Sequence, residues 1–300
     1  MQTPLQGIVP PMVTPLSDRD TLDVPGLERL IEHMLGGGVH GLFILGTTGE
    51  APSLGYRLRR ELIQRVCRQV AGRVPVLVGI SDTAMVESLA LARHAAEAGA
   101  AAVVAAPPFY FPAGQPELLD YVAHLTADLP LPLYLYNMPA MTKVSFAPQT
   151  LRQLLDNRRI AGVKDSSGDM GYFEQLLAIA RGRPDWSVLI GPEHLLADAV
   201  ARGGHGGVNG GANLHPRLFV KLYEAALRGD AAQVAVLREQ VFHLSRIYQV
   251  GRHASAIIKG LKCALSLRGL CDDHLAEPFR RFESPEREKV RQIVEALDLA

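Results

Sequence analysis

The sequence predicts an α/β protein built as a closed (β/α)8 barrel, the TIM-barrel architecture, with a helical extension at its C-terminal end. Eight short apolar runs recur along the first two thirds of the chain, separated by stretches whose apolar residues have helical spacing. After the eighth run the pattern becomes almost entirely helical. Alternating strands and helices indicate a parallel sheet, and eight units favour a barrel over an open sheet, which more often has about six strands.

The predicted strands are continuous apolar runs, as expected of parallel strands that are buried on both faces. In chain order they cover residues 7–13, 41–45, 75–80, 101–106, 132–136, 160–164, 187–190 and 206–208. The helices between them are predicted at residues 24–35, 57–70, 83–98, 116–127, 170–180 and 193–201. The turn after the first strand, at residues 14–17, lacks the glycine signature of a doubly wound sheet, which again favours the barrel.

The region after the eighth strand carries four predicted helices, at residues 216–227, 231–249, 254–267 and 285–297. No segment of low-complexity composition precedes them, so we expect no separate domain. The sequence therefore predicts a catalytic barrel over residues 1–225 and a helical extension over residues 226–300 that packs on it.

Composition excludes several classes of protein. The 300 residues include 31 basic and 31 acidic side chains, which removes the positive charge expected of a nucleic-acid-binding protein. A hydrophobic content of 48% excludes a disordered chain. Three scattered cysteines without a C-x-x-C motif favour a reducing compartment. With no signal peptide and no convincing membrane span in the sequence, we expect a cytoplasmic protein that binds neither nucleic acid nor membrane.

The strongest chemical signal is Lys164, which ends the sixth predicted strand. Active sites of barrel enzymes lie at the carboxyl ends of the strands, so Lys164 should enter a funnel lined by protein. Partial loss of hydration favours the free amine, which can attack a ketone and form an imine. A structural ion pair with Asp165 or another acidic residue is the alternative that the residues leave open.

Two further strand ends carry groups that suit such chemistry. Tyr136 ends the fifth strand and can move protons beside an imine, although a tyrosine at a barrel rim can also serve only packing. Thr47 and Thr48 lie between Gly46 and Gly49, where backbone amides and hydroxyls can converge on an anion. Local hydrogen bonding within the turn is an equally good reading of these threonines.

The glycine-rich segment 203–211 follows the position where many barrels bind phosphate. It holds no lysine, arginine or serine, so a carboxylate or a hydroxyl group is the expected guest. His194 and His205 should lie near the mouth, but no histidine belongs to a metal-binding motif. We therefore expect no metal.

Three motifs together resemble the dihydrodipicolinate synthase and N-acetylneuraminate lyase family of barrel enzymes. They are Gly46-Thr47-Thr48-Gly49-Glu50, Tyr136-Asn137-x-Pro139 and Gly162-Val163-Lys164-Asp165. The resemblance extends over the whole chain. It implies a class I lyase that acts on pyruvate through a covalent imine at Lys164 and needs no other cofactor.

The resemblance also implies roles for single residues. Lys164 would form the imine with a 2-oxo acid, and Tyr136 would be the general acid and base beside it. Thr47 would link a proton relay, which Tyr110 would complete by reaching into the site of a neighbouring subunit. This role of Tyr110 implies a homotetramer arranged as a dimer of dimers.

The predicted substrate-binding residues surround this catalytic group. Thr48 and the main chain of Val208 would hold the carboxylate of the 2-oxo acid from two sides. The reactants would be a small 2-oxo acid and an aldehyde. The remaining members of the predicted binding set are Gly46, Ser166, Gly191 and Asn209.

One departure from the family pattern bears on the second reactant. Met141 stands where the lysine-pathway synthases carry an arginine that grips the carboxylate of aspartate semialdehyde, and methionine cannot form that contact. Gly210 and Gly211 replace the serine and threonine of the sialic acid lyases. The motifs are closest to 2-keto-3-deoxygluconate aldolase-like members. The lysine-pathway synthase, an imine-dependent dehydratase or deaminase, and a non-catalytic 2-oxo-acid-binding protein remain alternatives.

Overall fold

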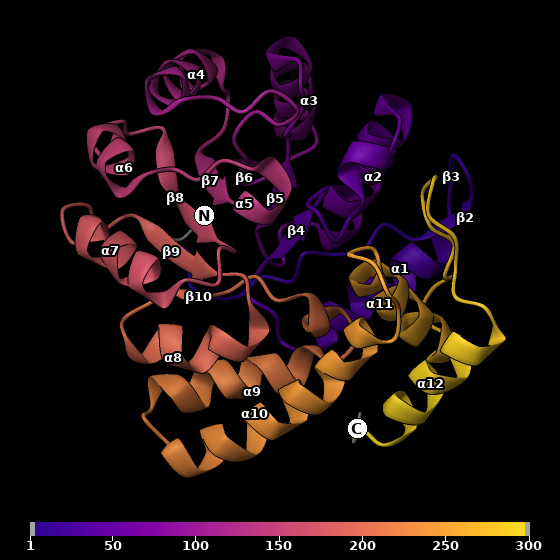
Figure 1. Ribbon diagram of the computed structural model, residues 1–300. Coiled ribbons are helices and arrows are strands. Elements are labelled where there is room, and N and C mark those ends of the chain that lie inside the picture. Colours follow the sequence, from indigo (N-terminus) through magenta and orange to yellow (C-terminus); the bar gives the residue numbers. More distant parts are fainter. Residues whose placement is uncertain (1–3, 298–300) are drawn as a thin grey trace.

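The computed structural model describes residues 4–297, and eight of its strands form one parallel sheet (Figure 1). The strand order is β1-β10-β9-β8-β7-β6-β5-β4, so the strands from β4 to β10 pair in chain order and β1 lies beside the last strand, β10. All eight predicted strands are present, most of them shorter than expected. Their bounds are β1 (Gly7–Ile8), β4 (Leu42–Ile44), β5 (Val76–Gly79), β6 (Ala102–Ala105), β7 (Leu133–Asn137), β8 (Ile160–Asp165), β9 (Ser187–Ile190) and β10 (Gly206–Gly207).

The sheet closes on itself through the segment that follows β1. Pro11 forms a parallel bridge with Phe43 of β4. The Phe43 amide donates to the Pro10 carbonyl at 2.9 Å, and the Met12 amide donates to the Phe43 carbonyl at 2.8 Å. These bonds join the first strand to the second, and the predicted (β/α)8 barrel is confirmed.

Helices follow the strands and surround them (Figure 1). They are α1 (Val24–Gly36), α2 (Tyr56–Val70), α3 (Met85–Glu97), α4 (Gln115–Asp128), α6 (Pro148–Leu154), α7 (Met170–Ala180), α8 (Leu196–Ala201) and α9 (Pro216–Leu227). Sequence analysis missed α6 because its seven residues span only two turns, too few for a periodic pattern. It also missed the turn of helix α5 (Pro139–Thr142) and a hairpin of β2 (Leu16–Asp18) and β3 (Thr21–Leu22).

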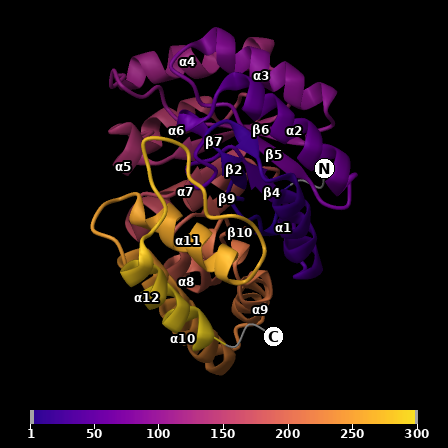
Figure 2. The same ribbon diagram turned by 90° about the vertical axis from the view of Figure 1, so that its right-hand side faces the viewer.

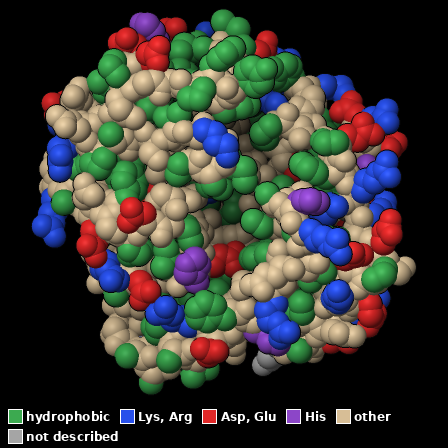
Figure 3. Space-filling model, in the orientation of Figure 1, with side chains coloured by type: hydrophobic (Ala, Val, Ile, Leu, Met, Phe, Trp, Pro, Cys, Tyr) green, Lys and Arg blue, Asp and Glu red, His purple; other side chains and the backbone are tan. Residues whose placement is uncertain are grey.

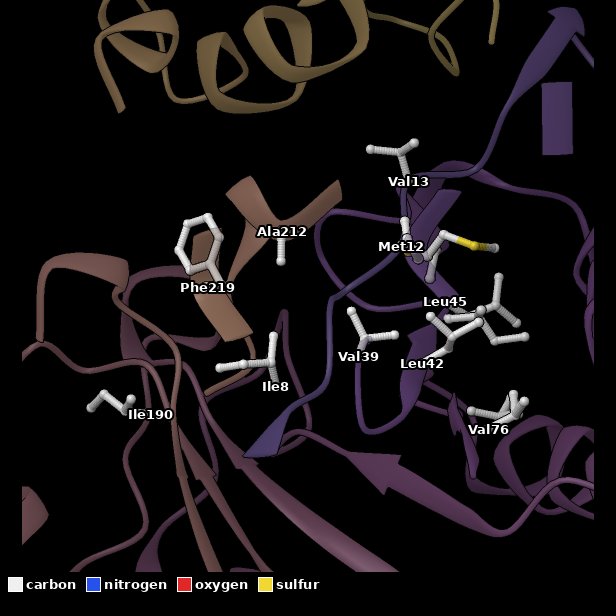
Figure 4. Packing of buried hydrophobic residues seen from close by; sticks show 14 of the residues in the cluster. Ile8, Met12, Val13, Val39, Leu42, Leu45, Val76, Ile190, Ala212 and Phe219 are labelled. Carbon is white, nitrogen blue, oxygen red and sulfur yellow. The ribbon is translucent and has the colours of Figure 1, made fainter. Parts of the chain in front are cut away.

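Two apolar layers hold the barrel together. Side chains alternate along each strand, so on β7 Leu133 and Leu135 pack against the helices while Tyr134 and Tyr136 fill the interior. The outer layer is the larger cluster, part of which is seen in Figure 4, with residues from β1, β4 and α9 converging. The interior layer is small, and it carries the polar groups of the site.

The extension comprises α10 (Ala231–Ser245), η4 (Arg246–Gln249), α11 (Ala256–Leu267) and α12 (Ser284–Glu295). Its helix α10 packs on α9, and α11 packs on η4 and α12, so these segments gather on one side of the barrel (Figure 2). The helix predicted at 231–249 changes to 3₁₀ geometry at Arg246. The division at residue 225 stays a prediction. No helix within residues 4–297 has the length and apolar character needed to cross a bilayer.

Candidate active site

Lys164 and Tyr136 occupy paired positions on β8 and β7, and both side chains belong inside the barrel. The Lys164 Nζ lies 4.1 Å from the centroid of the Tyr136 ring and 5.2 Å from that of Phe43. Only 6% of Lys164 is exposed. The amine is therefore held against two aromatic rings in a largely dry setting.

Asp165 does not pair with Lys164, so the alternative of an ion pair between these two residues is wrong. As the next residue on the strand, Asp165 points to the other face. Its carboxylate accepts hydrogen bonds from Asn137 Nδ2 and Ser167 Oγ, each at 2.9 Å. Burial raises the pKa of Asp165, although these hydrogen bonds act in the opposite direction. The carboxylate ties the end of β7 to the loop after β8 and leaves the Lys164 amine without an acidic partner there.

Tyr136 is the second candidate catalytic residue of the site. Its hydroxyl lies 3.3 Å from Thr47 Oγ1. Burial acts to raise the pKa of Tyr136, but the positive charge of Lys164 and hydrogen bonds with Thr47 and Ser166 outweigh burial, so the pKa is lowered. A tyrosine in this state exchanges a proton more readily than an ordinary one.

A cavity of about 500 Å³ opens at the carboxyl ends of these strands, and the space-filling view shows the middle of this face hollowed (Figure 3). It brings together most of the residues expected from the sequence. Those that line it are Thr47, Thr48, Tyr136, Lys164, Ser166, Gly191 and Val208.

Glycine at position 191 is required by a close approach. A Cβ atom there would lie 2.0 Å from Ser166 Oγ and would push that hydroxyl from its place. The Gly191 amide also donates to the Asp165 carbonyl at 2.7 Å. Gly191 therefore acts by leaving room for Ser166, and its amide is already bonded.

Other predicted residues lie apart from this cavity. Gly46 lines a smaller adjoining cavity of about 190 Å³, which shares Thr47 and Tyr136 with the first. Asn209 is wholly buried and donates to the Gly191 carbonyl at 2.9 Å, so it supports the loop. Tyr110 is 85% exposed and lines neither cavity.

Two further expectations need correction. The Val208 amide donates to the Ile190 carbonyl at 2.8 Å, so this amide is not available to a substrate carboxylate. His205 precedes β10, and its Nδ1 accepts from the Val188 amide at 3.1 Å. It therefore lies at the amino end of the strands, away from the mouth, whereas His194 does line the cavity.

Part of the cavity lining comes from the extension, through residues of α10, η4 and α11. The sequence did not predict this contribution. Tyr248 of η4 donates to Glu193 Oε1 at 2.9 Å, and the Gly211 amide donates to the same oxygen. Glu193 Oε2 is buried and has no hydrogen-bond partner. Burial raises the pKa of Glu193, partly offset by the bonds from Gly211 and Tyr248. Glu193 and Tyr248 are 55 positions apart in the chain, and no local sequence pattern predicts their contact.

Comparison with known proteins identifies the family. The model of the dihydrodipicolinate synthetase family matches residues 4–297. The chain belongs to this family. Since its relatives are named as aldolases and synthases of this type, the chain is an enzyme of the pyruvate-dependent lyase class.

Three relatives illustrate the range of the family. A solved structure described as dihydrodipicolinate synthase from Bacteroides thetaiotaomicron is 54% identical, covers 99% of this chain and 100% of its own, and superposes with a TM-score of 0.96. YagE of Escherichia coli, provisionally named a 2-dehydro-3-deoxy-D-gluconate aldolase, is 30% identical over 98% of this chain and 97% of its own. Its structure in complex with pyruvate gives a TM-score of 0.93. The 4-hydroxy-tetrahydrodipicolinate synthase of Thermomicrobium roseum is 33% identical over 95% of this chain and 92% of its own.

Proposed function

We propose that the protein is a class I lyase that reversibly cleaves a 2-keto-3-deoxy sugar acid into pyruvate and an aldehyde. Lys164 Nζ attacks the C2 ketone, and loss of water gives a protonated imine. The C3–C4 bond then breaks, its electron pair moves toward the iminium nitrogen, and the C4 hydroxyl loses its proton as the aldehyde forms. Protonation of the enamine at C3 and hydrolysis release pyruvate and restore the amine.

Tyr136 is the proposed proton carrier for these steps. Its hydroxyl lies beside Thr47, and its lowered pKa eases removal of the proton from the C4 hydroxyl. Thr48 lines the same cavity and is the proposed ligand of the substrate carboxylate. No other cofactor enters the proposed reaction.

The residues that line the cavity favour a sugar acid as the substrate. Among the described residues that line the cavity there is no arginine, and Glu193 contributes a carboxylate to the lining. A hydroxyl group can donate to a carboxylate, whereas a second substrate carboxylate would meet the negative charge of Glu193 without an arginine to bind it. This favours a neutral, hydroxylated aldehyde.

The imine is tested by incubating the protein with pyruvate and borohydride. We expect a reduced pyruvate adduct on the peptide that contains Lys164, seen by mass spectrometry. The exposed Lys143, whose Nζ bonds the Ala140 carbonyl, supplies the matched control, because Lys143→Met should keep the adduct. An unmodified Lys164 at saturating pyruvate would exclude the mechanism.

The aldehyde is tested with a panel that contains glyceraldehyde, glycolaldehyde and aspartate semialdehyde, each with pyruvate. We expect turnover with the hydroxylated aldehydes. Glu193→Gln should lower kcat/KM for them by about tenfold, since one charged hydrogen bond is lost, and leave imine formation unchanged. Incubation with a 2-keto-3-deoxy acid separates cleavage, which releases an aldehyde, from dehydration. Imine formation without any turnover would favour a 2-oxo-acid-binding protein.

A lysine-pathway synthase is the second candidate, favoured by the 54% identical chain that is described as such a synthase. Met141, which lines the cavity, argues against it because it occupies the place of the carboxylate-binding arginine. Turnover restricted to aspartate semialdehyde would establish the second candidate and overturn our interpretation of Met141.

The assembly is proposed to be a dimer of dimers. Tyr110 and Phe111 are 85% and 80% exposed and contact each other edge to face at a centroid distance of 5.2 Å, a pair of aromatic side chains suited to burial in a partner. Sedimentation of a fully active monomer would contradict the relay role of Tyr110. Three buried free cysteines support a cytoplasmic location.

A further inference from the structure

A fully buried ion pair joins residues 46–50, here called the threonine turn, to the extension. Glu50, the last residue of that turn, contacts the Lys262 Nζ of α11 through Oε1, and the two side chains are 1% and 0% exposed. Glu50 Oε2 accepts from the Ala276 amide at 2.8 Å, and Lys262 Nζ also donates to the His274 carbonyl at 2.7 Å. Each charged group thus has one hydrogen-bond partner within the protein in addition to the ion pair.

The turn is fixed at several points by these and neighbouring bonds. The Glu50 amide donates to the Thr47 carbonyl at 3.1 Å, and Thr14 Oγ1 donates to the Gly49 carbonyl at 2.7 Å. Glu50 itself adopts a left-handed backbone conformation, with φ of 57°. A non-glycine residue keeps this conformation only where the surroundings hold it, and the contacts of its side chain do so.

Neither charged residue lines the cavity, so neither can contact the substrate. A buried ion pair adds little net stability compared with apolar side chains, because removing both charges from water offsets their attraction. The pair is therefore better explained by the one arrangement it enforces than by its contribution to the free energy of folding.

We propose that Glu50 and Lys262 are positioning residues that hold Thr47 and Thr48 in place for pyruvate. This makes the extension part of the active site. The proposal rests on the imine chemistry of the proposed function for its main measurement. It adds that pyruvate affinity depends on the contact between Glu50 and Lys262 of α11.

The test measures the pyruvate concentration at which half of Lys164 is trapped by borohydride. Lys262→Met leaves the buried Glu50 carboxylate without its cation, and we expect the half-saturating concentration to rise by about tenfold or more as the turn shifts. Glu50→Gln should act in the same direction, because Lys262 and the Ala276 amide face different oxygens of the carboxylate, and glutamine would turn a donating NH2 group toward one of them. Circular dichroism at the assay temperature establishes that each variant is folded.

A matched control is available within the extension. Arg287 pairs with the buried Asp273, and neither residue contacts the threonine turn. Arg287→Met removes a charge of the same sign from the same region, and its half-saturating pyruvate concentration should equal that of the wild type. A rise equal to that of Lys262→Met would overturn the positioning role.

The double variant tests whether the effect passes through the charges. Glu50→Gln with Lys262→Met leaves no unpaired charge, so it should recover part of the pyruvate affinity lost in Lys262→Met. Folded single variants with wild-type half-saturation would refute the proposal.

A second measurement is independent of the imine. In threonine-methyl NMR spectra of the ligand-free protein, the Thr47 and Thr48 signals should shift in Lys262→Met and stay unchanged in Arg287→Met. If the wild type forms no imine, the proposed function fails, and these spectra alone decide the positioning role. Unshifted Thr47 and Thr48 signals would then refute it.

Discussion

Tyr134 and Tyr136, two tyrosines of the same strand, differ in the direction of their pKa shifts although both lie in the barrel interior. Tyr134 and Tyr136 both point inward from β7 and are both buried. Burial raises the pKa of Tyr134 to about 12, and its hydroxyl lies 3.4 Å from Ser187. Tyr136 is equally enclosed, yet Lys164 and its hydrogen-bond partners outweigh burial and lower its pKa. Burial alone raises the pKa of a tyrosine, whereas a buried cation beside it can outweigh burial and lower the pKa.

Removing the cation should have the largest effect on this contrast. Lys164→Met eliminates the proposed nucleophile, and we expect kcat to fall by about 10⁵-fold or more, measured as pyruvate release. It should also raise the pKa of Tyr136 because the lowering charge is gone. Residual activity at a tenth of the wild type would contradict both roles of Lys164.

Removing the hydroxyl of Tyr136 or of Tyr134 should affect kcat very differently. Tyr136→Phe should lower kcat by about 10²- to 10⁴-fold, the range for loss of a general acid and base. Tyr134→Phe is the matched control, with the same chemical change on the same strand, and should leave kcat within a fewfold of the wild type. Equal losses of kcat in the two variants would end the distinction.

Alkaline titration should distinguish Tyr136 from Tyr134 by the pH at which each hydroxyl ionises. Monitoring phenolate absorbance, we expect Tyr136 to ionise below the ordinary value of 10.0 and Tyr134 to ionise near 12. The early transition should disappear in Tyr136→Phe and persist in Tyr134→Phe.

The same shifts affect stability with opposite signs. As pH rises through the window below 10.0, the unfolded chain holds more protons at Tyr136 than the folded chain, so the free energy of unfolding gains from this residue. Between about 10 and about 12 the folded chain holds more protons at Tyr134, so stability is lost there. Denaturant titrations of the two phenylalanine variants against pH measure each contribution.

The smallest change is expected in the free energy of unfolding, from removing the hydroxyl of Ser187 beside Tyr134. Ser187→Ala removes the long hydrogen bond to Tyr134 and should lower the free energy of unfolding by about 1 kcal/mol, measured by urea denaturation. Pyruvate affinity should not change, because Ser187 lies outside the cavity. A lowered pyruvate affinity would show that the Tyr134–Ser187 pair influences the cavity around Lys164 and Tyr136.

The strand ends were predictable from the sequence because parallel strands bring their carboxyl ends to one edge. This rule predicts that Lys164, Tyr136, Thr47 and Thr48 meet at one site, and all four line the same cavity. The roles of these residues remain predictions, since geometry brings groups together without measuring a reaction.

Contacts between distant segments were not predictable. Helical spacing in residues 231–249 predicted an amphipathic helix but not that Tyr248 would bond Glu193. His205 was misplaced because the glycine-rich segment has no clear strand boundary, and Asn209 because its side chain bonds backbone within the loop. In each case the partner is chosen by tertiary packing rather than by local pattern.

The composition of the cavity wall has an evolutionary consequence. Lys164 and Tyr136 stand on barrel strands, whereas Phe242, Tyr248 and Ile257 reach the same cavity from the extension. Substitutions at these helical positions can alter which second reactant is accepted, while the strands that carry the residues of the proposed imine chemistry are inherited unchanged. A duplicated gene could thus acquire a new aldehyde preference through a few substitutions outside the barrel.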